Sequence, residues 1–355
     1  MQVAIVRKYG GPEVVELAKA EVPTPKPGEL LVRVTAVAVT AGDNRLRSGV
    51  FPKGFGPIAK LGVGFRGPRK SVLGIAYAGV VERLGEGVTE FAEGDRVAGV
   101  NGKTLGMHAE YATVPVSRAT KIPEGVAPAQ AVGALFGGTT ALFFLRDKAR
   151  VQPGHRVLVN GAAGSVGSAA VQLAKLFGAH VTAVTSGQNE EFVKRLGADE
   201  VINYEYTPVE SLCSGAAVSG AHTVSGADTD SLPGEQAPSK FDVVLDTVGN
   251  IDRKLGLALA TNAAVVVLIA ADLAGTLGAR GRVVAGVAPE RAADFAYLLR
   301  LVADGQFDPV VTSVGGLEQI EEAHRVAASG HKVGNVVVEP CSEMAATKAA
   351  GGSAL

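Results

Sequence analysis

The spacing of hydrophobic positions changes about one third of the way along the chain. Residues 1–120 contain short apolar runs separated by glycine and proline turns, and helical spacing is nearly absent there. From about residue 121, apolar runs of strand length alternate with segments whose apolar residues lie three and four positions apart. The first pattern predicts a compact β-barrel-like domain. The second predicts an α/β domain, in which a parallel sheet is covered on both faces by helices.

The same patterns predict individual elements. In the first region, 30–39 is a strand candidate, and 48–70, rich in Gly, Pro and Phe, is expected to form a loop over a cleft. The strands expected later are 157–159, 180–184, 201–202, 241–245, 264–269 and 282–287. The helices expected there are 189–196, 289–304 and 317–329, and 333–338 is expected to be a strand that returns to the first domain.

A glycine-rich turn joins the strand at 157–159 to an amphipathic segment, and it reads Asn160-Gly-Ala-Ala-Gly-Ser-Val-Gly167. Strand, glycine turn and helix form the context in which such a motif indicates dinucleotide binding. Backbone N–H groups and the positive end of the helix would face a pyrophosphate, and a side chain at Gly164 would block its approach. The expected contacts are Asn160, Gly161, Ala162, Ala163, Gly164, Ser165, Val166 and Gly167. A turn whose glycines serve only packing is the alternative.

Composition narrows the function classes. The formal net charge of −1 offers no basic field for nucleic acid or an anionic membrane, so neither partner is expected. The two cysteines, Cys213 and Cys341, form neither a disulfide framework nor a metal-ligand cluster. The chain begins with a strand-like segment instead of a signal peptide, and its most apolar run is 263–271. We therefore expect a soluble protein of a reducing compartment, located in the cytoplasm.

Two segments lack periodic patterns. Residues 207–240 are rich in Ser, Gly, Ala and Pro, which predicts a long surface loop or a disordered insert within the α/β domain. Residues 341–355 are small and polar, and are expected to form a frayed tail.

Several motifs together resemble a known family. They are Gly74-x4-Gly79, Gly94-Asp-x-Val97, His108-Ala-Glu-Tyr111, Phe136-Gly-Gly-Thr-Thr140, the glycine turn, Leu196-Gly-Ala-Asp199, Asp246-Thr-Val-Gly249 and Gly330-His-Lys-Val-Gly-Asn335. Because these motifs occur in this order and at this spacing, the chain resembles a medium-chain dehydrogenase/reductase of the zinc-independent, quinone-oxidoreductase-like branch. The resemblance implies a GroES-like domain from 1–120 and 289–340, and a Rossmann domain, 121–288. It also implies a nicotinamide cleft at their junction and a homodimer paired through the strand near 282–287.

Zinc is not expected. Zinc-dependent relatives carry a cysteine ahead of the position of Asp43, a Gly-His-Glu motif and a four-cysteine lobe. Here the corresponding stretches read Val39-Thr-Ala-Gly-Asp43 and Gly74-Ile-Ala-Tyr77, and the lobe is missing. Zinc needs three or four Cys, His or carboxylate ligands, and these positions supply none.

The end of the second Rossmann strand bears on the choice of cofactor. NAD-preferring folds place an acid there, but this chain has Thr185, Ser186 and Asn189 in a stretch without a carboxylate. By resemblance, Tyr204 matches a tyrosine of NADPH enzymes, whereas their cation near position 189 is missing. NADPH is therefore the expected cofactor and NADH is not excluded. Helix capping is the alternative role for Ser186 and Asn189.

Other site residues follow from the resemblance. Thr140 matches a threonine beside the nicotinamide, with a hydroxyl at a helix N-terminus as the alternative role. Thr247, Val248 and Gly249 follow the fourth strand, at the edge where ligands bind in such sheets. Gly334 and Asn335 match a Gly-Lys pair near the cofactor phosphates, and His108, His155 and His324 are expected to serve packing or the surface.

The implied reaction is hydride transfer from NADPH to a quinone or a conjugated enone. The protein orients the cofactor and stabilises the developing oxygen charge. The candidates that line the cleft are Thr40, Asp43, Tyr77 and Thr140, with solvent as a possible proton donor and a structural turn acid as the alternative role of Asp43. Two other functions stay open: reversible alcohol–ketone oxidation, and a non-catalytic protein that binds NADPH as a signal or structural ligand.

Overall fold

The computed structural model describes residues 1–214, 240–330 and 332–341. Its contacts divide the chain into two units, Met1–Thr139 with Pro289–Leu355 (unit 1) and Thr140–Ala288 (unit 2). The division between the units falls within helix α3, Pro128–Leu142, and again between residues 288 and 289. Most of the expected insert (215–239) and almost all of the expected tail (342–355) lie outside the described residues.

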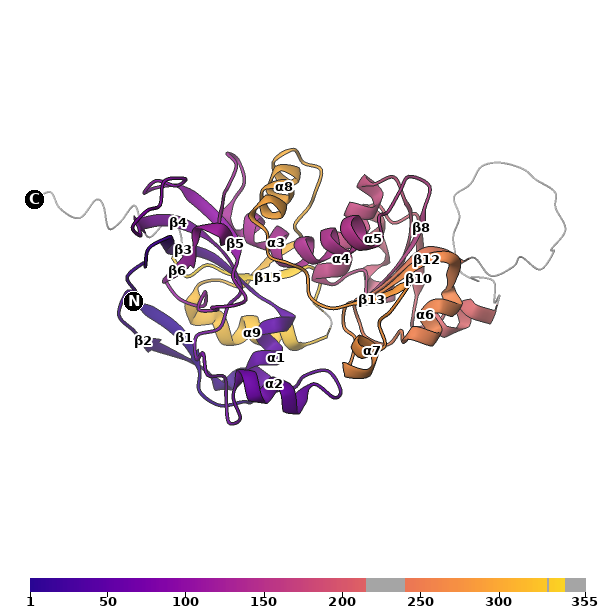
Figure 1. Cartoon of the computed structure of the whole chain (residues 1–355), viewed down its shortest axis with the longest axis horizontal. Helices are drawn as coiled ribbons and strands as arrows, with labels where there is room; N and C mark the ends of the chain where they lie inside the picture. The colour runs from indigo at the N-terminus through magenta and orange to yellow at the C-terminus, as the bar shows by residue number, and fades with distance from the viewer. Residues whose placement is uncertain (215–239, 331, 342–355) are drawn as a thin grey trace, which may run out of the picture. The chain divides into compact units, whose positions relative to one another are not determined.

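Unit 2 contains a six-stranded parallel sheet in the order β10-β9-β8-β11-β12-β13 (Figure 1). Its strands are β8 Arg156–Asn160, β9 His180–Thr185, β10 Glu200–Asn203, β11 Phe241–Asp246, β12 Ala260–Leu268 and β13 Val283–Ala285. Its helices are α4 Ser165–Leu176, α5 Glu190–Arg195, α6 Arg253–Leu259 and α7 Leu273–Leu277. The expected parallel sheet is confirmed, because the nearly continuous Val, Leu and Ala runs are buried.

The strand order in unit 2 reverses between β8 and β11. The chain moves from β8 to β9 and β10 on one side, then crosses back to place β11 on the other side of β8. In open α/β sheets, ligands bind at such a switch point, outside the carboxyl ends of the strands. The topology therefore indicates a ligand site at the carboxyl ends of β8 and β11.

Unit 1 is built from both ends of the chain. Its larger sheet has the order β14-β15-β3-β4-β5-β7, with β6 paired to β3. These strands are β3 Glu29–Val39, β4 Ala76–Leu84, β5 Arg96–Val100, β6 Tyr111–Pro115, β7 Thr120–Lys121, β14 Val311–Ser313 and β15 Asn335–Val338, and a separate pair is β1 Gln2–Val6 with β2 Val15–Lys19. The antiparallel pairing of β15 with β3 confirms the expected return strand and the GroES-like domain formed from both chain ends.

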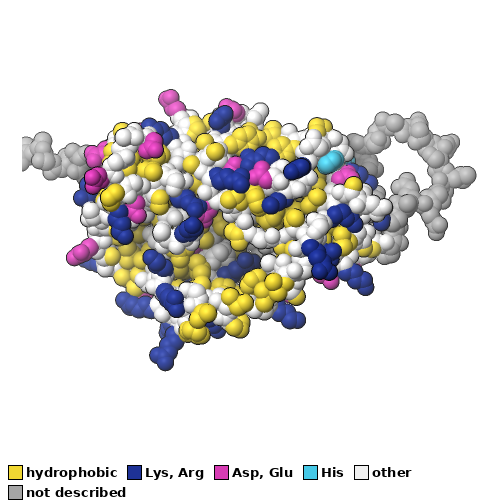
Figure 2. Space-filling model, in the orientation of Figure 1, with side chains coloured by type: hydrophobic (Ala, Val, Ile, Leu, Met, Phe, Trp, Pro, Cys, Tyr) yellow, Lys and Arg dark blue, Asp and Glu magenta, His cyan; other side chains and the backbone are white. Residues whose placement is uncertain are grey.

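Helices within the first 120 residues differ from the expectation. Helix α1 spans Ala41–Ser48, and α2, Gly56–Val63, lies inside the stretch expected to be a loop. A Ser/Thr-x-x-Asp/Glu sequence signals a helix start, and Thr40-Ala-Gly-Asp43 has this form, so α1 was predictable. Helix α2 buries none of its residues and was missed because it lacks an inward apolar face. Figure 2 shows hydrophobic side chains beside Lys and Arg at the lower edge, where Figure 1 draws α2.

The remaining helices of unit 1 include α8, Ala292–Ala303, and α9, Ile320–Ala328, both within the ranges expected from the sequence. Helix α3 continues into a π-helical turn, Phe143–Lys148. Among the described residues, this continuous stretch is long and apolar enough to cross a membrane, but two thirds of its most apolar window is buried in the protein. A core helix has the same composition, so the stretch is weak evidence for a membrane span.

Candidate functional site

The turn between β8 and α4 leaves the start of a helix without a side-chain cap. Strand β8 ends at Asn160, Gly161 adopts a φ of 81°, and Gly164 is the N-cap of α4. Glycine offers no side-chain oxygen, and no side-chain hydrogen bond caps the helix. The first N–H groups of a helix have no partner within it, and together with the helix dipole they favour a negative ligand group. The turn therefore has the chemistry of a phosphate site.

The three glycines of the turn meet different surroundings. A Cβ at Gly161 would lie 2.5 Å from Oγ1 of Thr247, and one at Gly167 would overlap the carbonyl oxygen of Gly161. At Gly164, by contrast, the nearest atom would be the Gly161 oxygen at 3.5 Å. Gly161 is thus required by the close approach of the loop after β11, and Gly167 by the close approach of α4 to the turn, whereas the space before Gly164 is left open by the protein. That space is where a pyrophosphate would lie, so the residues fit a dinucleotide.

A buried polar cluster fixes the loop after β11 against the turn. Nδ2 of Asn160 donates to Oδ1 of Asp246 at 2.8 Å and to Oδ1 of Asn250 at 2.6 Å. The Asp246 carboxylate also accepts the N–H groups of Val248 and Gly249 at 3.0 and 2.9 Å. Burial raises the pKa of Asp246, and these donors offset part of that rise. The cluster positions two loops at the carboxyl ends of β8 and β11, as the strand order requires.

Some predicted cofactor contacts hold this arrangement themselves. Oγ1 of Thr247 donates to the carbonyl of Asn160 at 2.8 Å, and Ala162 is fully buried. Val248 is exposed beside them, and Gly249 has a φ of 98°. Of this group, Val248 and Gly249 are the residues that offer a surface to a ligand at the end of β11.

The end of β9 holds the residues expected near the adenosine ribose. Thr185 and Ser186 are buried, while Tyr204 is 48% exposed. Nδ2 of Asn189 donates to Oγ of Ser186 at 3.0 Å, and neither side chain caps the helix that follows it. The capping alternative weighed for these two residues is therefore wrong, because the side chains bond to each other.

A carboxylate also lies at the end of β9, although the sequence of that stretch has none. Oε2 of Glu205 accepts the N–H of Gly187 at 3.0 Å. Glu205 follows β10, which is the parallel neighbour of β9, so the two strand ends meet at one edge of the sheet. The stretch 185–189 itself has no carboxylate, but the neighbouring strand brings Glu205 beside it. The strand order, once known, would have revealed it.

Two candidate catalytic residues in unit 1 form the start of α1. Thr40 and Asp43 are buried, and each accepts a backbone N–H from the other, at 3.2 and 2.9 Å. Oδ2 of Asp43 also accepts the Thr40 hydroxyl at 2.6 Å, and Oδ1 accepts the N–H of Gly74 at 3.0 Å. The structural alternative weighed for Asp43 is thus the role that its hydrogen bonds support.

Tyr77 does not lie on a surface. Its side chain is fully buried in the core of unit 1, and its hydroxyl donates to the carbonyl of Arg118 at 3.1 Å. Burial raises the pKa of the Tyr77 phenol far above its ordinary value of 10. A phenol that is buried and already bonded cannot reach a substrate, so the expectation that Tyr77 lines a cleft is wrong.

The remaining candidates are placed as follows. Thr140 lies in the last turn of α3, half-buried, so the alternative of a hydroxyl at a helix N-terminus is wrong. Gly334 has a φ of 58°, and Nδ2 of the buried Asn335 donates to the carbonyl of Pro309 at 2.7 Å. Asn335 thereby ties β15 to the segment before β14. His108 and His324 are buried with their rings edge to face, as expected of packing residues.

The residues do not fit a zinc site. The described parts of the chain bring together no group of three or more His, Cys, Asp or Glu side chains with metal-binding geometry. At the stretches where zinc-dependent relatives carry ligands, Thr40 and Asp43 are engaged with α1 and Tyr77 with the core. No step of the chemistry is therefore assigned to zinc.

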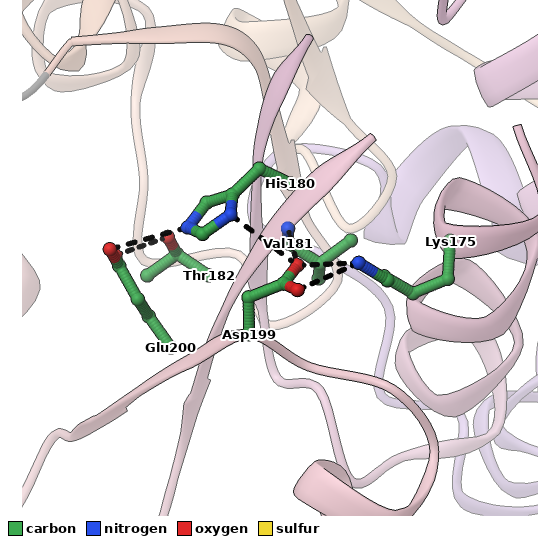
Figure 3. A network of polar contacts seen from close by, with 6 residues as sticks. All are labelled: Lys175, His180, Val181, Thr182, Asp199 and Glu200. Atoms are coloured by element: carbon green, nitrogen blue, oxygen red, sulfur yellow. Dashed lines mark hydrogen bonds and ion pairs between the residues drawn. The ribbon is translucent and has the colours of Figure 1, made fainter. Parts of the chain in front are cut away.

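An ion-pair network lies at the opposite, amino-terminal edge of the sheet in unit 2 (Figure 3). Nζ of Lys175, in the last turn of α4, contacts both oxygens of Asp199 at 2.7 and 2.8 Å, and Asp199 accepts the N–H of Val181. Burial alone would raise the pKa of Asp199, but these donors lower it below its ordinary value. His180 joins the network through Asp199 and Glu200. The network fixes the far end of α4 on β9 and β10, and so supports the helix whose start is the phosphate site.

Comparison with known proteins identifies relatives over nearly the whole chain. Residues 26–124 match the alcohol dehydrogenase GroES-like domain, and 196–338 match a family described as zinc-binding dehydrogenase. A chloroplastic quinone-oxidoreductase from Triphysaria versicolor is 30% identical over 344 residues, covering 94% of this chain and 96% of the relative.

Solved structures agree with this match. The quinone oxidoreductase from Coxiella burnetii aligns with a TM-score of 0.79 at 26% identity, covering 96% of this chain and 99% of that one. A mycobacterial protein in complex with NADPH aligns with a TM-score of 0.74 at 25% identity, covering 96% and 100%. With this coverage, and with the glycine turn at the sheet's switch point, the chain belongs to the quinone-oxidoreductase-like branch of the medium-chain dehydrogenase/reductase family, whose members are NAD(P)-dependent oxidoreductases.

Proposed function

We propose that this protein transfers hydride from NADPH to a quinone or an α,β-unsaturated carbonyl compound without zinc. The observation that carries the proposal is the uncapped start of α4, where the space before Gly164 is open and the glycines around it are fixed by packing. Quinone oxidoreductases among the relatives support the reaction, and a mycobacterial protein of similar structure in complex with NADPH supports the cofactor.

When bound, NADPH supplies the hydride, and the chain's own residues bind and orient it. In this proposal the diphosphate lies on the first N–H groups of α4, which begins at Ser165, and the loop 247–249 lines the site at the end of β11. Thr140 is the proposed hydroxyl near the nicotinamide. Thr40 and Asp43 act by positioning α1, and solvent supplies the proton.

We propose NADPH and not NADH as the better donor because Tyr204 is exposed at the end of β10, as in the NADPH enzymes that the chain resembles. Glu205 opposes this choice, since its carboxylate lies at the ribose edge of the site and repels a 2′-phosphate. The proposal is therefore that NADPH binds with an affinity that Glu205 limits.

We also propose a cytoplasmic homodimer. Among the described residues, strand β13 is the last strand of the sheet in unit 2, and its outer edge is the one proposed to pair with a second copy. Sedimentation-equilibrium measurement of the mass in solution tests this, and a monomer at micromolar concentration would contradict it.

Stopped-flow measurement of NADPH absorbance tests the reaction. We expect oxidation of NADPH with 9,10-phenanthrenequinone, with 1,4-naphthoquinone or with a simple enone, and unchanged rates after dialysis against a chelator. Reduction of NADP⁺ by alcohols with no quinone turnover would indicate an alcohol dehydrogenase instead. NADPH binding, seen by fluorescence, without turnover of any acceptor would indicate a non-catalytic binding protein.

A further inference from the structure

One stretch of unit 1 has a charge balance unlike that of the whole chain. Between Asp43 and Glu82 there are seven Lys and Arg residues and no Asp or Glu, whereas the formal net charge of the chain is −1. Four of these cations, Lys53, Arg66, Arg69 and Lys70, are exposed, and in the described part of the chain none of the four forms an ion pair. The stretch is a local basic surface that the overall charge conceals.

The same stretch exposes large apolar side chains on one face of α2. Ile58 and Leu61 are three residues apart and share a face of the helix, and Phe65 follows the helix end at Gly64. Their exposed fractions are 60%, 63% and 67%. Apolar residues normally cluster on the buried face of a surface helix, so this face lacks a partner among the described residues of the chain.

The backbone around this face is held in place. The hydroxyl of Tyr9 donates to the carbonyl of Gly64 at 2.6 Å. The backbone N–H of Tyr9 donates to the carbonyl of Arg66 at 3.2 Å. Nζ of Lys60 lies 5.8 Å from the centre of the Tyr9 ring. Tyr9 thus fixes the end of α2 to the segment after β1. The apolar face is presented by an ordered backbone and does not result from a frayed segment.

We propose that this surface, defined by Ile58, Leu61 and Phe65 with Lys53, Arg66, Arg69 and Lys70, docks on the surface of an anionic lipid bilayer. An apolar helix face bordered by cations is the composition that lies in the interface of such a membrane, with the apolar side chains at the acyl boundary and the cations at the headgroups. A helix of eight residues is too short to span a bilayer, so the attachment is peripheral and reversible. The sequence-based expectation of no membrane partner rested on the net charge of the whole chain. That net charge hides the local excess of cations at this surface, because the rest of the chain carries an excess of acidic residues.

The cations of this surface favour an anionic membrane over a second copy of the chain as the binding partner. A second copy of the chain would place two basic surfaces against each other, which is repulsive, whereas phosphatidylglycerol headgroups neutralise them. The proposal does not depend on the reaction proposed above, because none of its residues is assigned to the cofactor.

Vesicle co-sedimentation tests the proposal. We expect the full chain to sediment with vesicles of phosphatidylcholine containing phosphatidylglycerol at low salt, but not with pure phosphatidylcholine. About 0.5 M NaCl should release it, because a Debye length near 4 Å screens the cations. Failure to bind the anionic vesicles, or equal binding to both kinds, would overturn the proposal.

Two variants with matched controls assign the binding to this surface. R66Q/R69Q/K70Q should weaken binding roughly a hundredfold, since each cation near an anionic surface contributes about a fivefold factor. The control K8Q/K19Q/K103Q makes the same charge change at exposed lysines elsewhere. It should weaken binding far less. I58S/L61S/F65S should abolish binding while L17S/L277S, at exposed residues elsewhere, leaves it intact. Melting temperatures show whether each variant is folded. Binding that survives in both surface variants would contradict the proposal, as would a surface that instead mediates self-association.

Discussion

The glycine turn of unit 2 and the Thr40–Asp43 pair of unit 1 were both candidates for chemistry, but the fold uses them differently. At the turn, neighbouring atoms of the protein leave no room for a side chain at Gly161 or Gly167, whereas the space before Gly164 is open. In the pair, each carboxylate oxygen and the hydroxyl already has a partner within the chain. A polar residue is open to a ligand when the fold has left its hydrogen-bonding capacity unused. By this criterion the turn is the proposed binding site, whereas the Thr40–Asp43 pair supports the start of α1.

The largest effect is expected at Gly167. In G167A, the added Cβ overlaps the carbonyl oxygen of Gly161, which belongs to the backbone and cannot move aside cheaply. We expect a loss of about 3 kcal/mol in the free energy of unfolding. Urea denaturation followed by circular dichroism measures it.

G164A is the matched variant at the other glycine. Gly164 has a φ of −74° and a ψ of 174°, which alanine adopts freely, so its stability should stay near that of the parent. Its affinity for NADPH should fall at least about tenfold, because the methyl group enters the space of the diphosphate. If G164A bound NADPH normally, the distinction between the two glycines would fail, and with it the proposed phosphate site.

The next effect concerns Asp43. In D43N, an amide replaces one of two oxygens that accept three donors, so one buried donor loses its partner. We expect a loss of about 2 kcal/mol in stability, with kcat reduced less than tenfold at a temperature where the variant is folded. T40S, which keeps the hydroxyl, is the conservative control. A hundredfold fall in kcat with unchanged melting temperature would show that Asp43 is catalytic and reverse the comparison.

The two regions also differ in how far the sequence predicted them. The turn was predictable because strand, glycines and helix are consecutive, and their roles follow from local sterics. Tyr77 was misplaced because β4 is covered on both faces around this residue, and the elements that cover it come from distant parts of the chain. Glu205 was missed because its nearness to Gly187 depends on the order of β9 and β10 in the sheet. Contacts between distant segments need the topology, which residue patterns alone do not determine.

A further prediction tests the buried interior of unit 1 through the pH dependence of stability. Burial lowers the pKa of His324 from 6.5 to about 2, and the neighbouring His108 and Arg47 add to this. Below pH 6.5 the unfolded chain takes up a proton that the folded chain does not, so stability should fall by up to about 1.4 kcal/mol per pH unit. In the described structure, neither ring nitrogen of His324 has a hydrogen-bond partner. H324L should therefore be at least as stable at pH 7 and lose less stability on acidification.

Thermal unfolding between pH 7 and pH 5 measures this dependence. H155L, at a partly exposed histidine, is the control that should keep the acid sensitivity of the parent. An H324L variant that is strongly destabilised at pH 7 would mean that the ring makes an interaction in solution that its buried environment does not indicate.

The smallest expected effect lies at the ribose edge of the nucleotide site. Glu205 is exposed, so solvent weakens its repulsion of a 2′-phosphate to roughly 1 kcal/mol, or about fivefold in affinity. E205Q keeps an oxygen that can accept the N–H of Gly187 but removes the charge. It should therefore tighten NADPH about fivefold and leave NADH unchanged within a factor of two, as measured by fluorescence titration. E191Q removes a charge that is already paired with Lys194, and should change neither affinity. If E205Q strengthened the binding of both nucleotides equally, Glu205 would act on the shape of the loop and not on the 2′-phosphate. Its role would then be structural, like that of Thr40 and Asp43 in unit 1.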